Sequence, residues 1–272
     1  MKTVTRNDIA AAFAAVGIRP GDTLMLHSDI ARIGPVAGAK DRNGLLDAWL
    51  GGIRDALGAG GTLVVLTSTE AYARSNTPFI YEESPSEQGV LADHVRQQPG
   101  ALRSMHPLFS LTALGPGADA ICAGVAPTGY GHESPFDRLH RENAWIACLG
   151  VDLLAMSFTH HIEQMFGVPY GYTKEWRAPI WRASERIDRR FFAFVRYLDA
   201  GVEYDFTRFQ SLMLERGAAH KATLGYGTLH AVRAKDAFAI GVEQLKQDIF
   251  FFLEAPPAEE PWRSPPIESE GK

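Results

Sequence analysis

The chain has 272 residues, 46% of them hydrophobic, so it can bury a sizeable core and is not intrinsically disordered. A formal net charge of -5 gives no electrostatic basis for binding nucleic acid or a membrane surface. No apolar run reaches the roughly 18 residues of a spanning helix, and the N-terminus lacks the continuous apolar region of a signal peptide. We therefore expect a cytoplasmic protein with neither kind of partner.

The first quarter of the chain alternates helices with apolar strands. Thr5 or Asn7 can cap the first helix, and polar residues follow each strand. The expected elements are a helix over 8–16, a strand over 23–27, a helix from about 43 to 57 and a strand over 62–66. This order predicts a sheet covered by helices, with ligands beyond the strand ends.

The remaining elements are shorter, apart from the last helix. A loop over 71–88 precedes helices over 89–97 and 119–123, a strand near 108–114, a helical turn over 134–139 and a buried strand over 145–149. A helix over 205–216, a strand over 224–232 and a final helix over 236–253 follow. The proline-rich, charged segment 255–272 is expected to be a flexible tail.

These elements predict an α/β fold. We expect a three-layer α/β/α sandwich around a mixed, largely parallel sheet, with an added C-terminal helical and β region. Residues 1–254 form a single domain in this interpretation.

The segment THHIE offers one candidate site. His160 and Glu163 are three residues apart and share one helical face, so they can act as a general base and its orienting partner. A second interpretation is a metal site made of His160, His161, Glu163 and Asp152, although adjacent histidines point about 100° apart on a helix. A third is that these residues satisfy one another at the start of a helix.

Other polar groups allow more than one interpretation. Free backbone N–H groups around Ser28 could hold an anion, or this could be an ordinary βα loop. Arg103 could contact the same ligand or lie at the surface, and His106 is either a cleft residue or a packing residue. Cys122 and Cys148 have the surroundings of packed thiols, which disfavours catalysis through sulfur.

Several ordered motifs resemble the aminoglycoside 3-N-acetyltransferase family. They are GDTLMLHSDIARIG at 21–34, GAGGTLVVLTST at 58–69, the long segment ESPSEQGVLADHVRQQPGALRSMHPLFSLTALGP at 83–116, and the later GHESPFDRL, CLGVD and THHIE. The resemblance spans almost the whole chain. It implies an N-acetyltransferase that uses acetyl-CoA as co-substrate and no metal, acts on an amine such as an aminoglycoside antibiotic, and is a monomer or homodimer.

The resemblance also implies roles for individual residues. His160 would be the general base and Glu163 its orienting group, with Asp152 as a third catalytic residue. Acetyl-CoA would contact His27, Ser28, Asp29, Ile30, Ala31, Arg32, Ile33, Thr69, Arg103, Ser104 and Ser110. The amine would contact Glu70, His106, His161, Tyr170 and Tyr172, with residues 165–220 forming its side of the site.

Two departures from the family pattern affect this expectation. Asp29 and Arg32 stand where relatives have serines. The acceptor region is basic, with arginines at 182, 186, 189, 190 and 196, so it favours a neutral or anionic amine, such as an amino sugar, over a polycation. The alternatives are a metal-dependent hydrolase built on the His-His-x-Glu group and an inactive CoA-binding relative.

Overall fold

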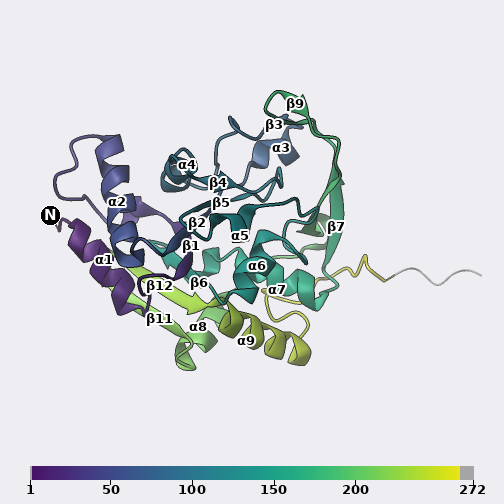
Figure 1. Ribbon diagram of the computed structural model, residues 1–272. Coiled ribbons are helices and arrows are strands. Elements are labelled where there is room, and N and C mark those ends of the chain that lie inside the picture. The colour runs from purple at the N-terminus through teal and green to yellow at the C-terminus, as the bar shows by residue number, and fades with distance from the viewer. Residues whose placement is uncertain (1, 264–272) are drawn as a thin grey trace, which may run out of the picture.

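The computed structural model describes residues 2–263 and is built around a seven-stranded sheet (Figure 1). The strand order is β11-β12-β6-β1-β2-β5-β4. The strands are β1 (Thr23–Ser28), β2 (Thr62–Leu66), β4 (Leu102–Arg103), β5 (Leu111–Leu114), β6 (Trp145–Leu149), β11 (Ala219–Leu224) and β12 (Gly227–Arg233).

The expectation of a largely parallel sheet is wrong. Only the central strands β6, β1 and β2 run parallel, whereas β12, β11, β5 and β4 each pair antiparallel with their neighbours. The reason lies in the connections, since β11 and β12 form a tight hairpin and β4 leads to β5 through a short loop. Short connections of this kind permit only antiparallel pairing. The fold is thus α/β with a mixed sheet.

Helices cover both faces of the sheet, because side chains alternate along each central strand. On β1, Leu24 and Leu26 belong to the core beneath α1, α2 and α4, whereas Met25 belongs to the core shared with α5 to α9. The helices are α1 (Arg6–Ala15), α2 (Arg42–Leu57), α3 (Glu70–Arg74), α4 (Val90–Arg96), α5 (Ala118–Cys122), α6 (Pro135–Arg141), α7 (Phe158–Phe166), α8 (Thr207–Glu215) and α9 (Ala234–Gln247).

A second β region stands beside the main sheet, at the right of Figure 1. Strand β7 (Gly171–Trp176) pairs antiparallel with β10 (Phe191–Arg196), and β8 (Ile180–Arg182) lies between β3 (Phe79–Ile80) and β9 (Glu185–Arg186). A small core links this region to the turn 105–109 through Met105, Leu108 and Phe191. Strands β7 to β10 fall within the predicted subregion 165–220, whereas β3 comes from an earlier part of the chain.

Three other predicted elements differ from the structure. Helix α3 lies almost wholly inside the predicted loop. Where one strand over 224–232 was predicted, the chain forms β12 and, before it, the antiparallel partner β11. Helix α9 ends at Gln247 instead of 253. Of the predicted tail, residues 264–272 lie outside the described residues. In its described part, 255–263, Trp262 packs against Tyr197 and Phe250. Among residues 2–263, no helix combines the length and apolar character that crossing a bilayer requires.

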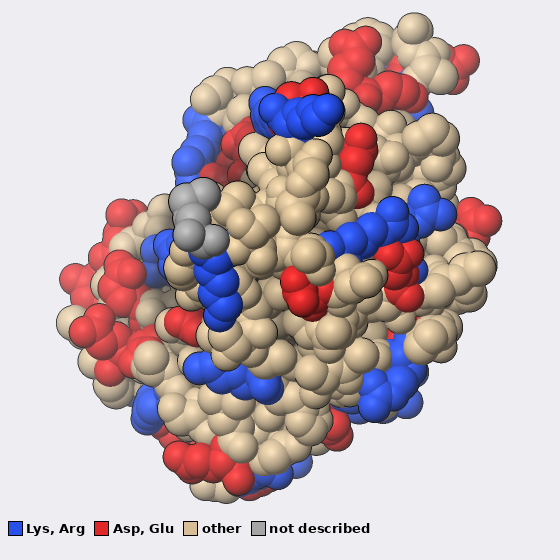
Figure 2. Space-filling view, turned by 90° about the vertical axis from the view of Figure 1, so that its left-hand side faces the viewer, with Lys and Arg blue, Asp and Glu red and all other residues tan. Residues whose placement is uncertain are grey.

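Surface charge follows the modest net charge. Figure 2 shows the side of the molecule that carries α1 and α2, where basic and acidic residues are interspersed. One ion pair joins the two helices, as Arg6 donates two hydrogen bonds to Asp55.

Candidate active site

Helix α7 carries a histidine and a glutamate on one face. His160 Nδ1 lies 2.6 Å from Glu163 Oε2, as their spacing of three residues allows. Glu163 is fully buried, whereas the His160 side chain is 26% exposed. An ionised carboxylate only accepts hydrogen bonds, so Nδ1 carries the proton and Nε2 keeps its lone pair. The pair has the arrangement of a general base and its orienting group.

His160 lies where two cavities adjoin. The first has a volume of about 310 Å³ and the second about 300 Å³, and both are lined by Phe109, Tyr130 and His160. The first has aromatic walls and two cationic side chains, Lys174 and Arg196. The polar part of the second cavity's lining is Ser68, Glu70, Arg74, Gln88, Ser157 and His160. An imidazole in this position is within reach of ligands in either cavity.

The carboxylate of Glu163 sits in an aromatic enclosure. Burial, and next the negative charge of Glu163, raises the pKa of Tyr130, Tyr170 and Tyr204, which keeps these phenols neutral. Glu163 Oε1 and the Tyr170 hydroxyl are buried without a hydrogen-bond partner among the described residues. His160 is therefore the strongest partner of this buried charge.

The turn after β1 is closed by its own side chains. Asp29 accepts a hydrogen bond from the Ala31 amide at 3.2 Å and pairs with Arg32 Nε at 2.9 Å, so the two departures from the family pattern neutralise each other. Gly150 has φ 70°, and a Cβ there would lie 2.1 Å from the Asp29 carbonyl oxygen. Only glycine lets the end of β6 pass so close to this turn.

The predicted contacts of acetyl-CoA with 27–33 differ in accessibility. Ile30 and Ile33 are buried in the core, so a ligand would meet the backbone of this turn instead of these side chains. His27 Nε2 is enclosed without a hydrogen-bond partner among the described residues, and burial lowers its pKa to about 4. None of residues 27–33 lines either cavity at His160. His27 is thus a neutral imidazole that lines neither of these cavities, and its contact with acetyl-CoA stays a prediction.

Four other predicted cofactor residues form an internal scaffold. Arg103 donates to Ser110 Oγ at 2.9 Å, to the Thr67 carbonyl oxygen at 2.7 Å and to Thr69 Oγ1 at 3.0 Å. Ser104 Oγ accepts a hydrogen bond from the backbone of β5, and all four side chains are buried. Protein partners occupy their polar atoms, so their predicted contact with the cofactor finds no support in these hydrogen bonds and stays a prediction. They hold the loop after β2 in place.

Of the two interpretations of His106, a cleft residue or a packing residue, the structure supports the second. Its Nε2–H donates to the Phe192 carbonyl oxygen at 2.9 Å, and its Nδ1 accepts from the Phe109 amide at 2.9 Å. The ring is buried and joins β10 to the turn that carries Phe109. It is corrected from a substrate contact to a support of the first cavity.

The other predicted substrate residues divide into two groups. Tyr172 lines the first cavity and Glu70 the second. His161 and Tyr170 are fully buried and line neither, so these cavities give no support to their expected contact with substrate. His161 instead donates from Nδ1 to the Tyr130 carbonyl oxygen at 2.6 Å.

Asp152 does not join the histidine–glutamate pair. It precedes a short 3₁₀ helix (Leu153–Ala155), its Oδ1 lies 3.9 Å from Nδ1 of His230, and it lines neither cavity. The predicted metal set of His160, His161, Glu163 and Asp152 is therefore not assembled, because successive helical side chains diverge. Cys122 and Cys148 are free and buried, and burial raises the pKa of both thiols.

Sequence reasoning missed most of the cavity lining. Tyr130, Tyr204, Trp176 and Lys174 were not among the candidates, although each lines at least one of the two cavities. The available signal was the alternation of aromatic and basic residues after position 164. It indicates a wall rich in rings and cations but not which side chains face inward.

A mixed α/β sheet with a histidine–carboxylate pair at two adjoining cavities defines an enzyme with room for two ligands. The family model for aminoglycoside 3-N-acetyltransferase matches residues 25–246, and the chain belongs to this family. It is therefore an acyltransferase, specifically an N-acetyltransferase.

Individual relatives agree with this assignment. The chain is 29% identical to aminoglycoside N(3)-acetyltransferase VII of Streptomyces paromomycinus over 90% of this chain and 93% of that protein. It is 28% identical to aminoglycoside N(3)-acetyltransferase III of Pseudomonas aeruginosa, covering 92% and 94%. The crystal structure of aminoglycoside acetyltransferase AAC(3)-Xa superimposes with a TM-score of 0.78 at 27% identity, covering 90% and 93%. AAC-IIIb in its binary complex with CoASH gives 0.78 at 25% identity, covering 94% and 100%.

Proposed function

We propose that the protein transfers an acetyl group from acetyl-CoA directly to an amine, with His160 as general base. The observation that carries the proposal is the 2.6 Å contact between His160 and the buried Glu163 at the junction of two cavities. The similarity to AAC-IIIb, whose structure holds CoASH, supports acetyl-CoA as the donor. Buried, protonated thiols support direct transfer over an acyl-cysteine intermediate.

The transfer step balances with a single proton carrier. As the amine nitrogen attacks the thioester carbonyl carbon, His160 Nε2 takes a proton from that nitrogen, and the carbonyl oxygen becomes negative. The carbon–nitrogen bond is then complete, the carbon–sulfur bond breaks, and the proton passes to the CoA sulfur. Glu163 stabilises the imidazolium that exists between these two proton transfers.

The negative oxygen needs a hydrogen-bond donor. In the loop after β2, the Thr67 amide donates to the Ser110 carbonyl oxygen and the Thr69 amide to Leu108. Ser68 is one of the residues that line the second cavity together with His160, and its buried hydroxyl has no hydrogen-bond partner among the described residues. We assign Ser68 as the side chain that donates to the oxyanion.

The charges of the first cavity favour a neutral or anionic acceptor, as the sequence indicates. Lys174 and Arg196 line it, and its lining includes no aspartate or glutamate. Nearby Glu175 is already bonded to Arg177 and Arg190. A polycation would be repelled there, whereas an amino sugar that also carries a phosphate or carboxylate would be attracted. The names of the relatives favour a second candidate acceptor, an aminoglycoside.

One assay tests donor, acceptor and base together. Purified protein is incubated with acetyl-CoA and either glucosamine 6-phosphate, glucosamine or kanamycin, and free thiol is followed. We expect the phosphorylated amine to have the highest kcat/KM, and kanamycin as the best acceptor would reject the charge argument. His160→Ala should lose at least about a hundredfold in rate with unchanged CoA affinity. The matched control is His132→Ala, which removes an exposed imidazole outside both cavities.

A further inference from the structure

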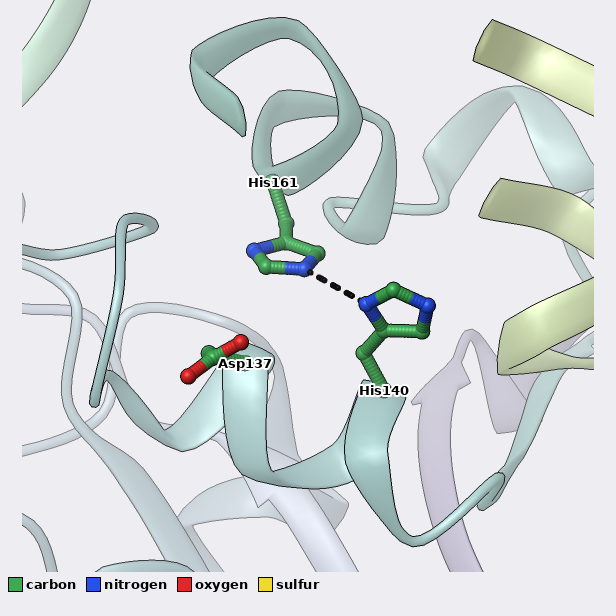
Figure 3. A group of neighbouring side chains, drawn as sticks. All are labelled: Asp137, His140 and His161. Atoms are coloured by element: carbon green, nitrogen blue, oxygen red, sulfur yellow. Dashed lines mark hydrogen bonds between the residues drawn. The ribbon is translucent and has the colours of Figure 1, made fainter. Parts of the chain in front are cut away.

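A second histidine cluster lies behind α7, on the side that faces away from the cavities. It consists of Asp137 and His140 on α6 and His161 on α7, whose ligand-type atoms all lie within 4.8 Å of one another (Figure 3). Asp137 and His161 are buried and His140 is half-buried. None of the three lines either cavity or takes part in the proposed chemistry.

From this geometry we propose that Asp137, His140 and His161 bind a divalent transition metal ion, with Zn²⁺ as the best fit. His161 Nε2 lies 3.3 Å from His140 Nδ1. In a tetrahedral zinc site, two nitrogens at about 2.0–2.1 Å from the ion are roughly 3.3–3.4 Å apart. The spacing of the two nitrogens thus suits a shared ion, and a small rotation of His140 aims both lone pairs at it.

The second coordination shell is already in place. His161 Nδ1–H donates to the Tyr130 carbonyl oxygen at 2.6 Å, which fixes the lone pair on Nε2. This bond to a carbonyl is the usual support of a metal-bound histidine. The Asp137 carboxylate is held in a similar way, since its Oδ2 accepts the Glu133 amide hydrogen at 2.8 Å.

The carboxylate already lies close to the two nitrogens. All three ligand atoms are within 4.8 Å of one another, so the approach needed to reach the roughly 3.4 Å edge of a zinc tetrahedron is at most about 1.4 Å. Arg141 lies 3.5 Å from Asp137 but also pairs with Glu133 at 2.9 Å, which limits its competition for the carboxylate. Three protein ligands leave the fourth position to water.

A metal ion here would tie α6 to α7 and to the turn that carries Tyr130. The carbonyl of Tyr130 accepts the hydrogen bond from His161, and its ring packs 5.3 Å from the His160 ring. The expected role is structural, because the ion would brace one wall of both cavities from behind. It would add no reacting group to the transfer step.

The test is zinc binding by the full chain after treatment with a chelator. We expect one equivalent of Zn²⁺ by equilibrium dialysis and a rise in Tm of roughly 5–10 °C at a hundredfold excess over Kd. Co²⁺ in its place should give the visible absorption bands of a tetrahedral site. Asp137→Asn and His140→Gln should each weaken binding at least about tenfold.

His132→Gln is the matched control. His132, Glu133 and Asp137 form a neighbouring cluster that shares the same carboxylate, but the His132 side chain is 73% exposed. Zinc binding should survive this change. Circular dichroism checks that each variant is folded. Equal zinc affinity in wild type and His140→Gln, or a loss confined to His132→Gln, would overturn the proposal.

Discussion

Replacing Glu163 by glutamine isolates the electrostatic part of the proposed mechanism. The side chain keeps its shape, so the helix and the cavities should be unchanged, but the buried negative charge disappears. Glu163 Oε1 lacks a hydrogen-bond partner among the described residues, and the amide oxygen of glutamine can still accept the hydrogen bond from His160 Nδ1. We therefore expect the variant to fold, which a Tm measurement checks.

The rate should fall steeply, for a reason that the geometry makes quantitative. In the wild type the imidazolium forms beside a carboxylate whose Oε2 is 2.6 Å from Nδ1. Two unit charges about 4 Å apart at an effective dielectric constant of about 20 attract each other by about 4 kcal/mol. Losing that attraction in the transition state corresponds to a rate about a thousandfold lower.

Thiol release from acetyl-CoA measures the effect on kcat and KM separately. The loss should fall on kcat, because Glu163 touches no substrate in this mechanism. Glu243→Gln, which removes an exposed carboxylate bonded to Arg216, is the control and should leave the rate unchanged. A folded Glu163→Gln enzyme within about tenfold of the wild-type rate would refute the role of the pair.

Three further predictions use different assays. Ser68→Ala should lower kcat by about a hundredfold or more with little change in KM, and a change in KM alone would contradict the oxyanion role. Burial lowers the pKa of His27, His106 and His161 to about 4 from 6.5, so the unfolded chain binds protons that the folded chain does not. The free energy of unfolding, measured in urea, should thus be highest above about pH 6.5 and fall as the pH approaches about 4. At about pH 5 the loss should be on the order of 2 kcal/mol for each ring, and a free energy of unfolding that does not change with pH would contradict this. Arg103→Lys should cost about 2–4 kcal/mol of stability with CoA affinity within about twofold, and a selective loss of CoA binding would restore its predicted cofactor role.

The pair on α7 was predictable because it depends on local geometry. A histidine and a glutamate three residues apart share a helical face wherever the helix lies. The buried strands before them were predictable for the same reason, since a short apolar run bounded by polar residues is typical of a central strand. Gly150 shows the limit of such reasoning, because its close approach to the Asp29 carbonyl depends on two strands that are adjacent only in space.

The wall of the first cavity was not predictable, because it depends on pairing over distance. Strand β7 aligns with β10 so that Tyr172 faces Val195 and Lys174 faces Ala193 across the ladder. Exposure along β7 follows no clean alternation, so its sequence lacks the period-2 signal of a half-buried strand. The inward direction of Lys174 and Trp176 emerges only when the two strands meet.

Buried polar networks explain why the sequence did not distinguish residues that contact a ligand from residues that support a loop. A loop that binds a ligand and a loop that is held by internal hydrogen bonds both need polar residues after a strand, so the sequences look alike. In this protein Arg103 bonds to Thr67 and Thr69, and His106 bonds to β10, which leaves neither free for a ligand. Ser68 stands between Thr67 and Thr69 and, unlike them, is one of the residues that line the second cavity.

The two adjacent histidines of α7 show how one helix can serve two functions. Because successive side chains on a helix diverge by about 100°, His160 reaches the cavities while His161 faces α6. Tyr130 connects the two sides, since its ring packs against His160 and its carbonyl oxygen accepts the hydrogen bond from His161. The position of the proposed base thus depends on contacts on the far side of its own helix, where the proposed metal ion would act.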